Sequence, residues 1–292
     1  MSRGSKPSPL KLYSLIALMV FFWSLNFVVG KIALRDFPPM LLACLRTTLA
    51  GVFVLPVYLL HQEKTQWKAR DVPLLIQLGV FGVALNQVFF VLGLNRTSVA
   101  HAALIIALTP LLVLLLASAR GLEAFSARKV AGMAIAVGGV GVIHIAKSSQ
   151  ASFVGDLFVL LAAITFTIFT VFAKEATARH GSVTMNTFAY AGGAILLLPV
   201  TILVSRDFDF AGVSAAGWLC LIYMALFPSV LCYLIYYYVL TYIPASRVSA
   251  FSYLQPFVAT LLAIPLLNEH VTISLIVGGT LVLLGVFVTE RT

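Results

Sequence analysis

Long apolar stretches, each about 20 residues long, dominate the pattern of hydrophobic and polar positions along the chain. Short segments with charges, glycine or proline separate them, for example at Pro38-Pro39, Arg120-Gly121 and Pro244. A stretch of this length crosses a bilayer as a helix, because lipid offers no partner for unpaired backbone groups. We therefore expect ten transmembrane helices, at residues 12–34, 39–60, 72–92, 100–119, 127–145, 155–173, 182–204, 216–239, 245–266 and 272–289.

The composition agrees with this pattern. Of the 292 residues, 61% are hydrophobic and only 10% are charged, whereas soluble domains carry about 25% charged residues. Ten spans leave too few residues for a water-soluble domain. The first apolar stretch resembles a signal peptide, but it runs from Leu12 to about Leu34, which is too long for a signal core, and we expect it to be retained.

The net charge of +9 does not indicate nucleic acid as a partner, because the basic residues occur in ones and twos between apolar stretches. Basic residues concentrate on the cytoplasmic side of membrane proteins. With the N-terminus inside, five lie outside: Lys31, Arg35, Arg96, Lys147 and Arg206. Thirteen lie inside: Arg3, Lys6, Lys11, Lys64, Lys68, Arg70, Arg120, Arg128, Lys129, Lys174, Arg179, Arg247 and Arg291. This bias predicts a multi-pass protein of the bacterial inner membrane with both termini in the cytoplasm.

The two halves of the chain resemble each other. Residues 94–143 align without a gap to residues 240–289 at a shift of 146, with eleven identities in fifty positions. The matches at this shift, and at a shift of 143 earlier in each half, include Pro110 with Pro256, Glu123 with Glu269, Gly132 with Gly278, Gly139 with Gly285, Lys31 with Lys174 and Pro56 with Pro199. We expect two repeats, residues 1–147 and 148–292. Each repeat then contains five helices. Because five is an odd number, the second repeat enters the membrane from the opposite side, so the repeats are inverted, an arrangement common in transporters.

Several segments resemble the EamA-type drug/metabolite transporters. These segments run from Trp23 to Lys31, from Pro39 through Arg46 to Pro56, and from Pro228 to Gly285, the last with Pro244-Ala245-Ser246, Leu254-Gln255-Pro256 and Asn268-Glu269. The resemblance implies ten helices around a central cavity and export of amino acids or related metabolites. Among family members the chain is most similar to the YddG-like exporters of aromatic and other apolar amino acids. Thr165-Phe166-Thr167 stands where the family often has a tryptophan, a departure that affects the expected cavity.

Polar and aromatic residues inside the spans are the candidate substrate-binding residues, because polar groups are costly in lipid. The helix at 12–34 carries Trp23 and Asn26, and the helix at 72–92 carries Asn86 and Phe90. An amide in hydrocarbon must find a partner, so these faces should turn inward. Hydrogen bonding between helices remains an alternative to cavity lining.

Arg46 lies about seven residues, or roughly 10 Å, into the second span from its outer end. One interpretation is that it attracts a substrate carboxylate. The other, which we favour on sequence alone, is structural: the side chain reaches the outer interface or pairs with a neighbouring helix end.

Two later spans add aromatic candidates with polar tips, which suit a neutral aromatic or aliphatic substrate side chain. Tyr233 lies deep in the eighth span, and Tyr253 and Gln255 lie in the ninth. Tyr236 to Tyr238 come near the end of the eighth span, a position typical of an interfacial aromatic belt.

Pro110 and Pro256 fall at equivalent positions of the two repeats, inside spans four and nine. Each removes a backbone hydrogen bond and kinks its helix. We hypothesise that these kinks are hinges for the change of access, with a static bend as the alternative. Glu123 and Glu269 lie at helix junctions, and we expect them to be water-exposed, with proton coupling as a second interpretation.

The sequence as a whole therefore predicts a secondary transporter that exports apolar or aromatic amino acids, or related small metabolites, by alternating access. No ATP-binding loop of the form G-x-x-x-x-G-K-[ST] occurs. An exporter of cationic compounds is the alternative, although it would favour a mid-membrane carboxylate. An intramembrane enzyme is a third class, but the histidines lie near span ends without metal spacing, and we expect no metal or cofactor. The oligomeric state remains open, with a monomer as one alternative.

Overall fold

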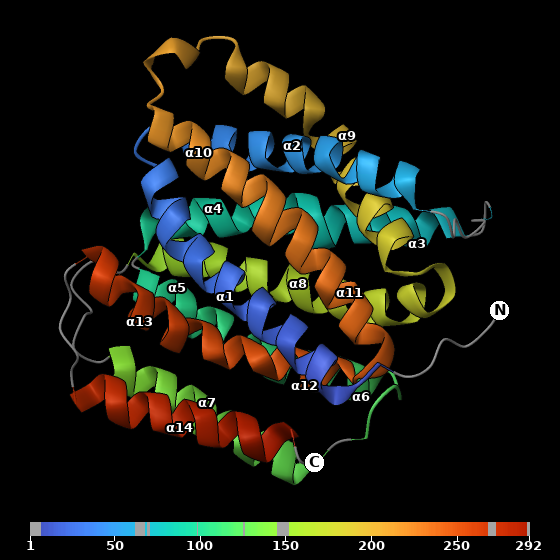
Figure 1. The fold of residues 1–292 in the computed structure, drawn as a ribbon, viewed down its shortest axis with the longest axis vertical. Coiled ribbons are helices and arrows are strands. Elements are labelled where there is room, and N and C mark those ends of the chain that lie inside the picture. The colour runs from blue at the N-terminus through green and yellow to red at the C-terminus, as the bar shows by residue number, and fades with distance from the viewer. Residues whose placement is uncertain are drawn as a thin grey trace.

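The computed structural model describes residues 7–61, 68, 71–97, 99–124, 126–144, 152–267 and 273–290, and these ranges contain helices and turns but no strand. Its first half contains α1 (Pro9–Ala33), α2 (Pro39–Leu60), α3 (Val72–Gln77), η2 (Leu78–Leu85), α4 (Asn86–Arg96), α5 (Val99–Ile106), α6 (Thr109–Ala119) and α7 (Ala127–His144). Its second half contains α8 (Phe153–His180), α9 (Ser182–Ser205), η3 (Phe210–Gly212), α10 (Ala215–Met224), η4 (Ala225–Leu231), α11 (Cys232–Tyr242), α12 (Ala245–Ala250), η5 (Phe251–Tyr253), α13 (Leu254–Leu267) and α14 (Ile273–Glu290) (Figure 1).

The expectation of an all-α membrane protein is confirmed. Within the described residues, six helical runs are long and apolar enough to cross a membrane: Pro9–Ala33, Pro39–Leu60, Val72–Arg96, Phe153–His180, Ser182–Ser205 and Ala215–Tyr242. The span expected at 155–173 is longer than predicted, because α8 continues to His180 and ends only at Gly181, whose φ is +76°. The span expected at 100–119 is interrupted by a turn at residues 107–108.

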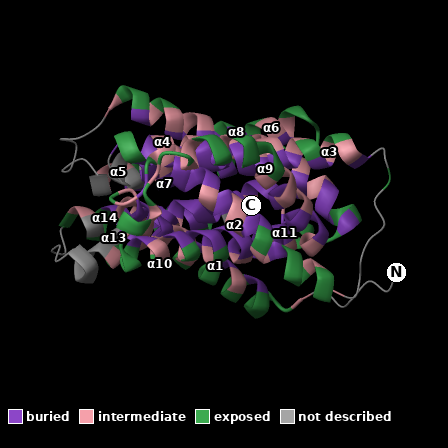
Figure 2. Cartoon of the chain, turned by 90° about the horizontal axis from the view of Figure 1, so that it is seen from above, coloured by how far each residue is buried: buried purple, intermediate pink, exposed green. Residues whose placement is uncertain are grey.

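Buried residues fill the middle of the molecule, and exposed residues cover its outside (Figure 2). Many exposed side chains are large and apolar, including Leu59, Ile195 and Leu219, which are 67%, 72% and 68% exposed. A water-soluble surface does not carry so many large apolar groups. These helices therefore present their apolar side chains to lipid.

Glycines permit close packing where α7 lies beside α14 (Figure 1). A Cβ atom added at Gly132 would lie 2.9 Å from the carbonyl oxygen of Gly285, and one at Gly139 would lie 2.6 Å from that of Gly278. The contact positions increase along α7 as they decrease along α14, so the two helices are antiparallel. A close approach of this kind is how small residues promote helix association in membranes.

Two runs change from α-helical to π-helical hydrogen bonding at η2 and η4. Pro228 contributes to the second change because it has no backbone N–H to donate. The hydroxyl of Ser229 donates to the carbonyl oxygen of Met224 at 2.8 Å. This carbonyl group therefore has a hydrogen-bond partner although the helical turn is disturbed. Short π-helical segments inside α-helices frequently occur at functional sites.

Two half-buried lysines fix the ends of helices. Lys31 Nζ, on α1, donates to the carbonyl oxygen of Thr97 at 2.9 Å, directly after α4. Lys174 Nζ, on α8, donates to the carbonyl oxygens of Leu240 at 2.9 Å and Ile243 at 2.7 Å, at the end of α11. Carbonyl groups at the end of a helix lack partners within that helix, and a positive charge there is favourable.

The expectation that Glu123 is water-exposed is wrong. Its side chain is only 6% exposed and lies 3.3 Å from Lys129 Nζ. It also accepts hydrogen bonds from the backbone N–H of Ser246, at 3.1 Å, and from the Ser246 hydroxyl. Glu123 therefore joins the turn after α6 to the start of α12. Its expected counterpart Glu269 and the expected boundary between residues 147 and 148 lie outside the described residues.

Candidate functional site: a central cavity

Helices from both halves of the chain enclose a cavity of about 580 Å³, a volume that includes the part open to the outside. Side chains from α1, α2, α4, α5, α6, α8, α11, η5 and α13 line it: Trp23, Asn26, Phe27, Arg46, Asn86, Gln87, Phe90, Ile106, Thr109, Phe166, Tyr233, Ser252 and Gln255. Among the described residues, the lining combines aromatic rings, amides, hydroxyls and one guanidinium group, and contains no acidic side chain.

The structure brings together all but one of the residues expected to bind substrate. Those that line the cavity are Trp23, Asn26, Arg46, Asn86, Phe90, Tyr233 and Gln255. Tyr253 does not line it, although its side chain is fully buried. Tyr253 ends the 3-10 turn η5, whereas its neighbours Ser252 and Gln255 contribute to the lining.

Six lining residues were not in the candidate set predicted from the sequence. Gln87 and Ser252 are polar groups inside spans and could have been included on that ground. Thr109 directly precedes Pro110, a weaker signal. Phe27 and Ile106 are apolar residues in apolar helices, so nothing in the pattern separates them from lipid-facing positions. Phe166 also lines the cavity, where the resemblance had indicated a departure from the family.

Arg46 is buried inside the protein rather than directed toward the membrane surface. The residue is 2% exposed, which contradicts the interpretation that its side chain reaches the outer interface. Its Nε donates to the hydroxyl of Ser229, on η4, at 3.0 Å. Its Nη1 has no hydrogen-bond partner among the described residues. A guanidinium group has five N–H donors, so Arg46 has unused donors beside the cavity.

Amides and a tyrosine from the two halves form a hydrogen-bonded network on one wall. The hydroxyl of Tyr233 donates to the carbonyl oxygen of Gly82 at 3.0 Å and accepts from Gln87 Nε2 at 3.4 Å. Asn86 Nδ2 donates to the carbonyl oxygen of Ala162 at 2.9 Å, which joins α4 to α8. Both alternatives from the sequence therefore hold at once: these side chains line the cavity and also connect helices.

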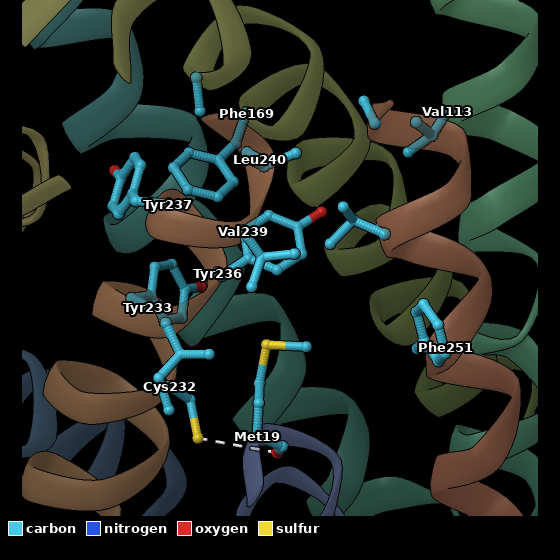
Figure 3. Packing of buried hydrophobic residues seen from close by; sticks show 14 of the residues in the cluster. Met19, Val113, Phe169, Cys232, Tyr233, Tyr236, Tyr237, Val239, Leu240 and Phe251 are labelled. Atoms are coloured by element: carbon cyan, nitrogen blue, oxygen red, sulfur yellow. Dashed lines mark hydrogen bonds between the residues drawn. The ribbon is translucent and has the colours of Figure 1, made fainter. Parts of the chain in front are cut away.

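Aromatic rings form part of the cavity wall. The Trp23 ring lies 5.9 Å from that of Phe166 and 5.5 Å from that of Tyr236, and Trp23 Nε1 donates to the carbonyl oxygen of Pro228 at 3.0 Å. Next to them, Phe169, Tyr233, Tyr236 and Tyr237 pack together from α8 and α11 (Figure 3).

Tyr236 and Tyr237 are fully buried, so the expectation of an interfacial belt is wrong for them. The reason is that α11 packs against α1, α8 and α9, which turns its aromatic face inward. The hydroxyl of Tyr236 lies 2.8 Å from that of Thr170, on α8. Sequence position near the end of a span therefore did not reveal which way these rings point.

The two candidate hinge prolines lie just after interruptions of their helices. Pro110 is in the first turn of α6, after the turn at residues 107–108 that separates it from α5. Pro256 is in the first turn of α13, directly after the 3-10 turn η5. Both interruptions lie beside cavity residues, namely Thr109 and Gln255. Both helices are therefore interrupted beside these prolines, and their role as hinges stays a prediction.

Lining residues from the two halves recur at constant separations. Trp23 and Phe166 are 143 positions apart. Three further pairs are 146 positions apart: Gln87 with Tyr233, Ile106 with Ser252, and Thr109 with Gln255. Gln87 and Tyr233 are hydrogen-bonded to each other.

Comparisons with known proteins agree with this architecture. The chain is 31% identical over 286 residues to an uncharacterised transporter of Archaeoglobus fulgidus, covering 97% of this chain and 99% of the relative. It is 27% identical to a probable terminal-alkyne amino-acid exporter of Streptantibioticus cattleyicolor, covering 94% and 92% of the two chains. A crystal structure with 20% identity has a TM-score of 0.79 and covers 97% of this chain and 98% of its own, which shows the fold alone.

The family comparison matches the chain twice, over residues 10–145 and again over residues 153–291. The two matches together cover nearly all of the 292 residues. The arrangement of apolar helices around a mixed polar and aromatic cavity is what a carrier of small molecules through a bilayer requires. The chain belongs to the EamA-like transporter family.

Proposed function

We propose that the protein exports apolar and aromatic amino acids, or closely related small metabolites, across the bacterial inner membrane. The observation that carries this proposal is the pairing, in one cavity, of the buried Arg46 guanidinium with aromatic walls. A guanidinium binds carboxylates through charge-assisted hydrogen bonds. Aromatic rings such as Trp23 and Phe166 suit an uncharged substrate side chain. The relative from Streptantibioticus cattleyicolor, described as a probable amino-acid exporter, supports the same substrate class.

The rival substrate class, cationic compounds, is disfavoured by the same geometry. In the part of the chain that the structure describes, no acidic side chain lines the cavity, and the charge that does line it is positive. A cation beside Arg46 would be repelled in surroundings that screen charge poorly. Energy for export would come from the gradient of the substrate or of an ion.

The proposed transport mechanism is alternating access between two inverted repeats, residues 1–147 and 148–292, with five transmembrane helices each. Equivalent contacts in the two halves support it. Lys31 donates a hydrogen bond to the carbonyl oxygen of Thr97, and Lys174 donates one to the carbonyl oxygen of Ile243. The two lysines are 143 positions apart, and the two acceptor residues are 146 positions apart. The antiparallel contact of α7 with α14 supports it too, because a two-fold axis in the membrane plane makes equivalent helices antiparallel. The two family matches also begin 143 positions apart, at residues 10 and 153, and end 146 positions apart, at residues 145 and 291.

Uptake into liposomes that contain the purified protein tests the substrate class. Labelled phenylalanine, leucine and lysine would be supplied separately, with and without an imposed proton gradient. We expect saturable uptake of phenylalanine and leucine but not of lysine. The effect of the gradient then distinguishes uniport from proton coupling. Uptake of lysine or of a cationic drug in place of the apolar amino acids would contradict the proposal.

A further inference from the structure

The polar groups that line the cavity divide into those already paired within the protein and those left over. Asn86, Gln87 and Tyr233 are hydrogen-bonded to one another or to backbone carbonyl groups. Arg46 Nη1 and Asn26 Oδ1 are buried and have no hydrogen-bond partner in the described part of the chain. Leaving a buried polar group unpaired costs about 1–3 kcal/mol. Two such groups in the wall of one cavity indicate partners that come from outside the protein.

The two unpaired groups have opposite requirements. Arg46 can only donate hydrogen bonds, whereas the Oδ1 atom of Asn26 can only accept them. A ligand that satisfies both must carry an acceptor and a donor. The carboxylate and the ammonium group of a free α-amino acid meet this requirement. Asn26 is 5% exposed and Arg46 is 2% exposed, so both lie well inside the protein.

Both unpaired groups belong to the first half of the chain. The residues 143 positions after Asn26 and Arg46 are Phe169 and Ala189, and neither has a polar side chain. The charged end of a ligand therefore has its partners on α1 and α2. Apolar contact for the remainder of the ligand is available at Phe166, on α8, which belongs to the second half. This division orients the ligand across the cavity.

We propose that Asn26 determines specificity by accepting a hydrogen bond from the α-ammonium group of the substrate, while Arg46 binds the α-carboxylate. The cavity thereby takes free α-amino acids in preference to carboxylates of the same shape that lack the amino group. Because the described lining holds no acidic side chain, the ammonium group is recognised by neutral oxygen atoms. This inference rests on the proposed function and adds to it the substrate group that the protein recognises, namely the α-ammonium group.

Calorimetric binding to the purified protein tests the inference, with L-phenylalanine and 3-phenylpropionate as a pair that differs only in the amino group. Hydrogen bonds to a charged group are worth about 1.5–3 kcal/mol, or roughly 10- to 100-fold in affinity. We expect the wild-type protein to prefer phenylalanine by a ratio in this range. In Asn26→Leu, which removes the acceptor, the two affinities should become nearly equal. Asn26→Asp keeps an acceptor and should retain or increase the preference.

The ratio of the two affinities distinguishes a recognition role of Asn26 from a structural one, because damage to the fold would weaken the binding of both ligands to the same extent. An Asn26→Leu protein that keeps the wild-type ratio would overturn the inference. If that variant fails to fold, loss of the preference in Asn26→Asp would overturn it instead. Equal binding of both ligands to the wild type would also overturn it, while leaving carboxylate transport in place. Binding of neither would remove the proposed function together with the inference.

Discussion

Arg46 shows most clearly how one residue links the chemistry of the cavity to the proposed substrate. It is the only basic residue among the described residues that line the cavity, and one of its hydrogen bonds is already made, to Ser229. This bond holds the guanidinium in place and leaves other N–H donors for a ligand. A buried charge of this kind is costly to the fold, so its presence needs a compensating interaction.

Replacing Arg46 separates charge from geometry. Arg46→Gln should reduce the affinity for phenylalanine by about 10- to 100-fold, because a charge-assisted hydrogen bond is lost. Arg46→Lys keeps the charge but not the planar fork, and should lose less. The affinities would be measured by competition in the uptake assay. Wild-type affinity in Arg46→Gln, in a protein that remains folded, would show that the carboxylate binds elsewhere.

Individual residues also show where sequence reasoning reaches its limit. Arg46, Asn26 and Asn86 were recognised because a polar side chain in a membrane span must face the interior. Ile106 was missed because an apolar side chain is equally suited to lipid and to a cavity wall. Glu123 was expected to be exposed because its partner Ser246 lies 123 positions away in the chain. No local pattern shows such a contact.

The helices themselves were more predictable than their interruptions. Apolar stretches between prolines, glycines and charges fixed most helix ends to within a few residues, because the hydrocarbon thickness sets the length. The π-helical segments η2 and η4 were not predicted: η2 has no local signal that distinguishes it from ordinary helix, and Pro228 in η4 indicates a disturbed helix without specifying a π-helical one. The turn at residues 107–108 was anticipated only as a kink near Pro110.

The glycines of α7 provide a matched test of helix packing. A Cβ at Gly139 would lie 2.6 Å from the carbonyl oxygen of Gly278, whereas a Cβ at Gly138 meets nothing within 4 Å. Gly139→Ala should therefore destabilise the protein by about 1–3 kcal/mol through overpacking. Gly138→Ala should be neutral or stabilise by up to about 1 kcal/mol, because alanine favours a helix. Thermal unfolding in detergent would compare them, and equal midpoints would contradict the packing described for α7 and α14.

The two bends near Pro110 and Pro256 are the elements that we expect to flex during transport. Replacing both prolines with alanine restores the missing backbone donors and should straighten the helices, which lowers the turnover rate while the protein stays folded. The matched control is the replacement of Pro56 and Pro199, which lie inside α2 and α9 and do not line the cavity. Unchanged turnover in the Pro110/Pro256 double variant would identify the bends as static.

At the scale of the whole molecule, the constant separations of 143 and 146 connect sequence, packing and the proposed mechanism. They relate lining residues such as Trp23 and Phe166, and they relate the lysines that cap α4 and α11. Differences between the halves matter as much, since Arg46 and Asn26 have apolar counterparts. The symmetric arrangement of the helices would allow the cavity to open to either side of the membrane in turn, and the asymmetric lining of the cavity would determine substrate specificity.

The most direct test of this account is counterflow of labelled phenylalanine in liposomes that contain the purified protein. Liposomes loaded with unlabelled leucine would be diluted into a trace of labelled phenylalanine, without any ion gradient. An alternating-access carrier for apolar amino acids should show a transient accumulation of label above equilibrium, and loading with lysine should show none. Label that only equilibrates, at a rate independent of the internal leucine, would contradict the account.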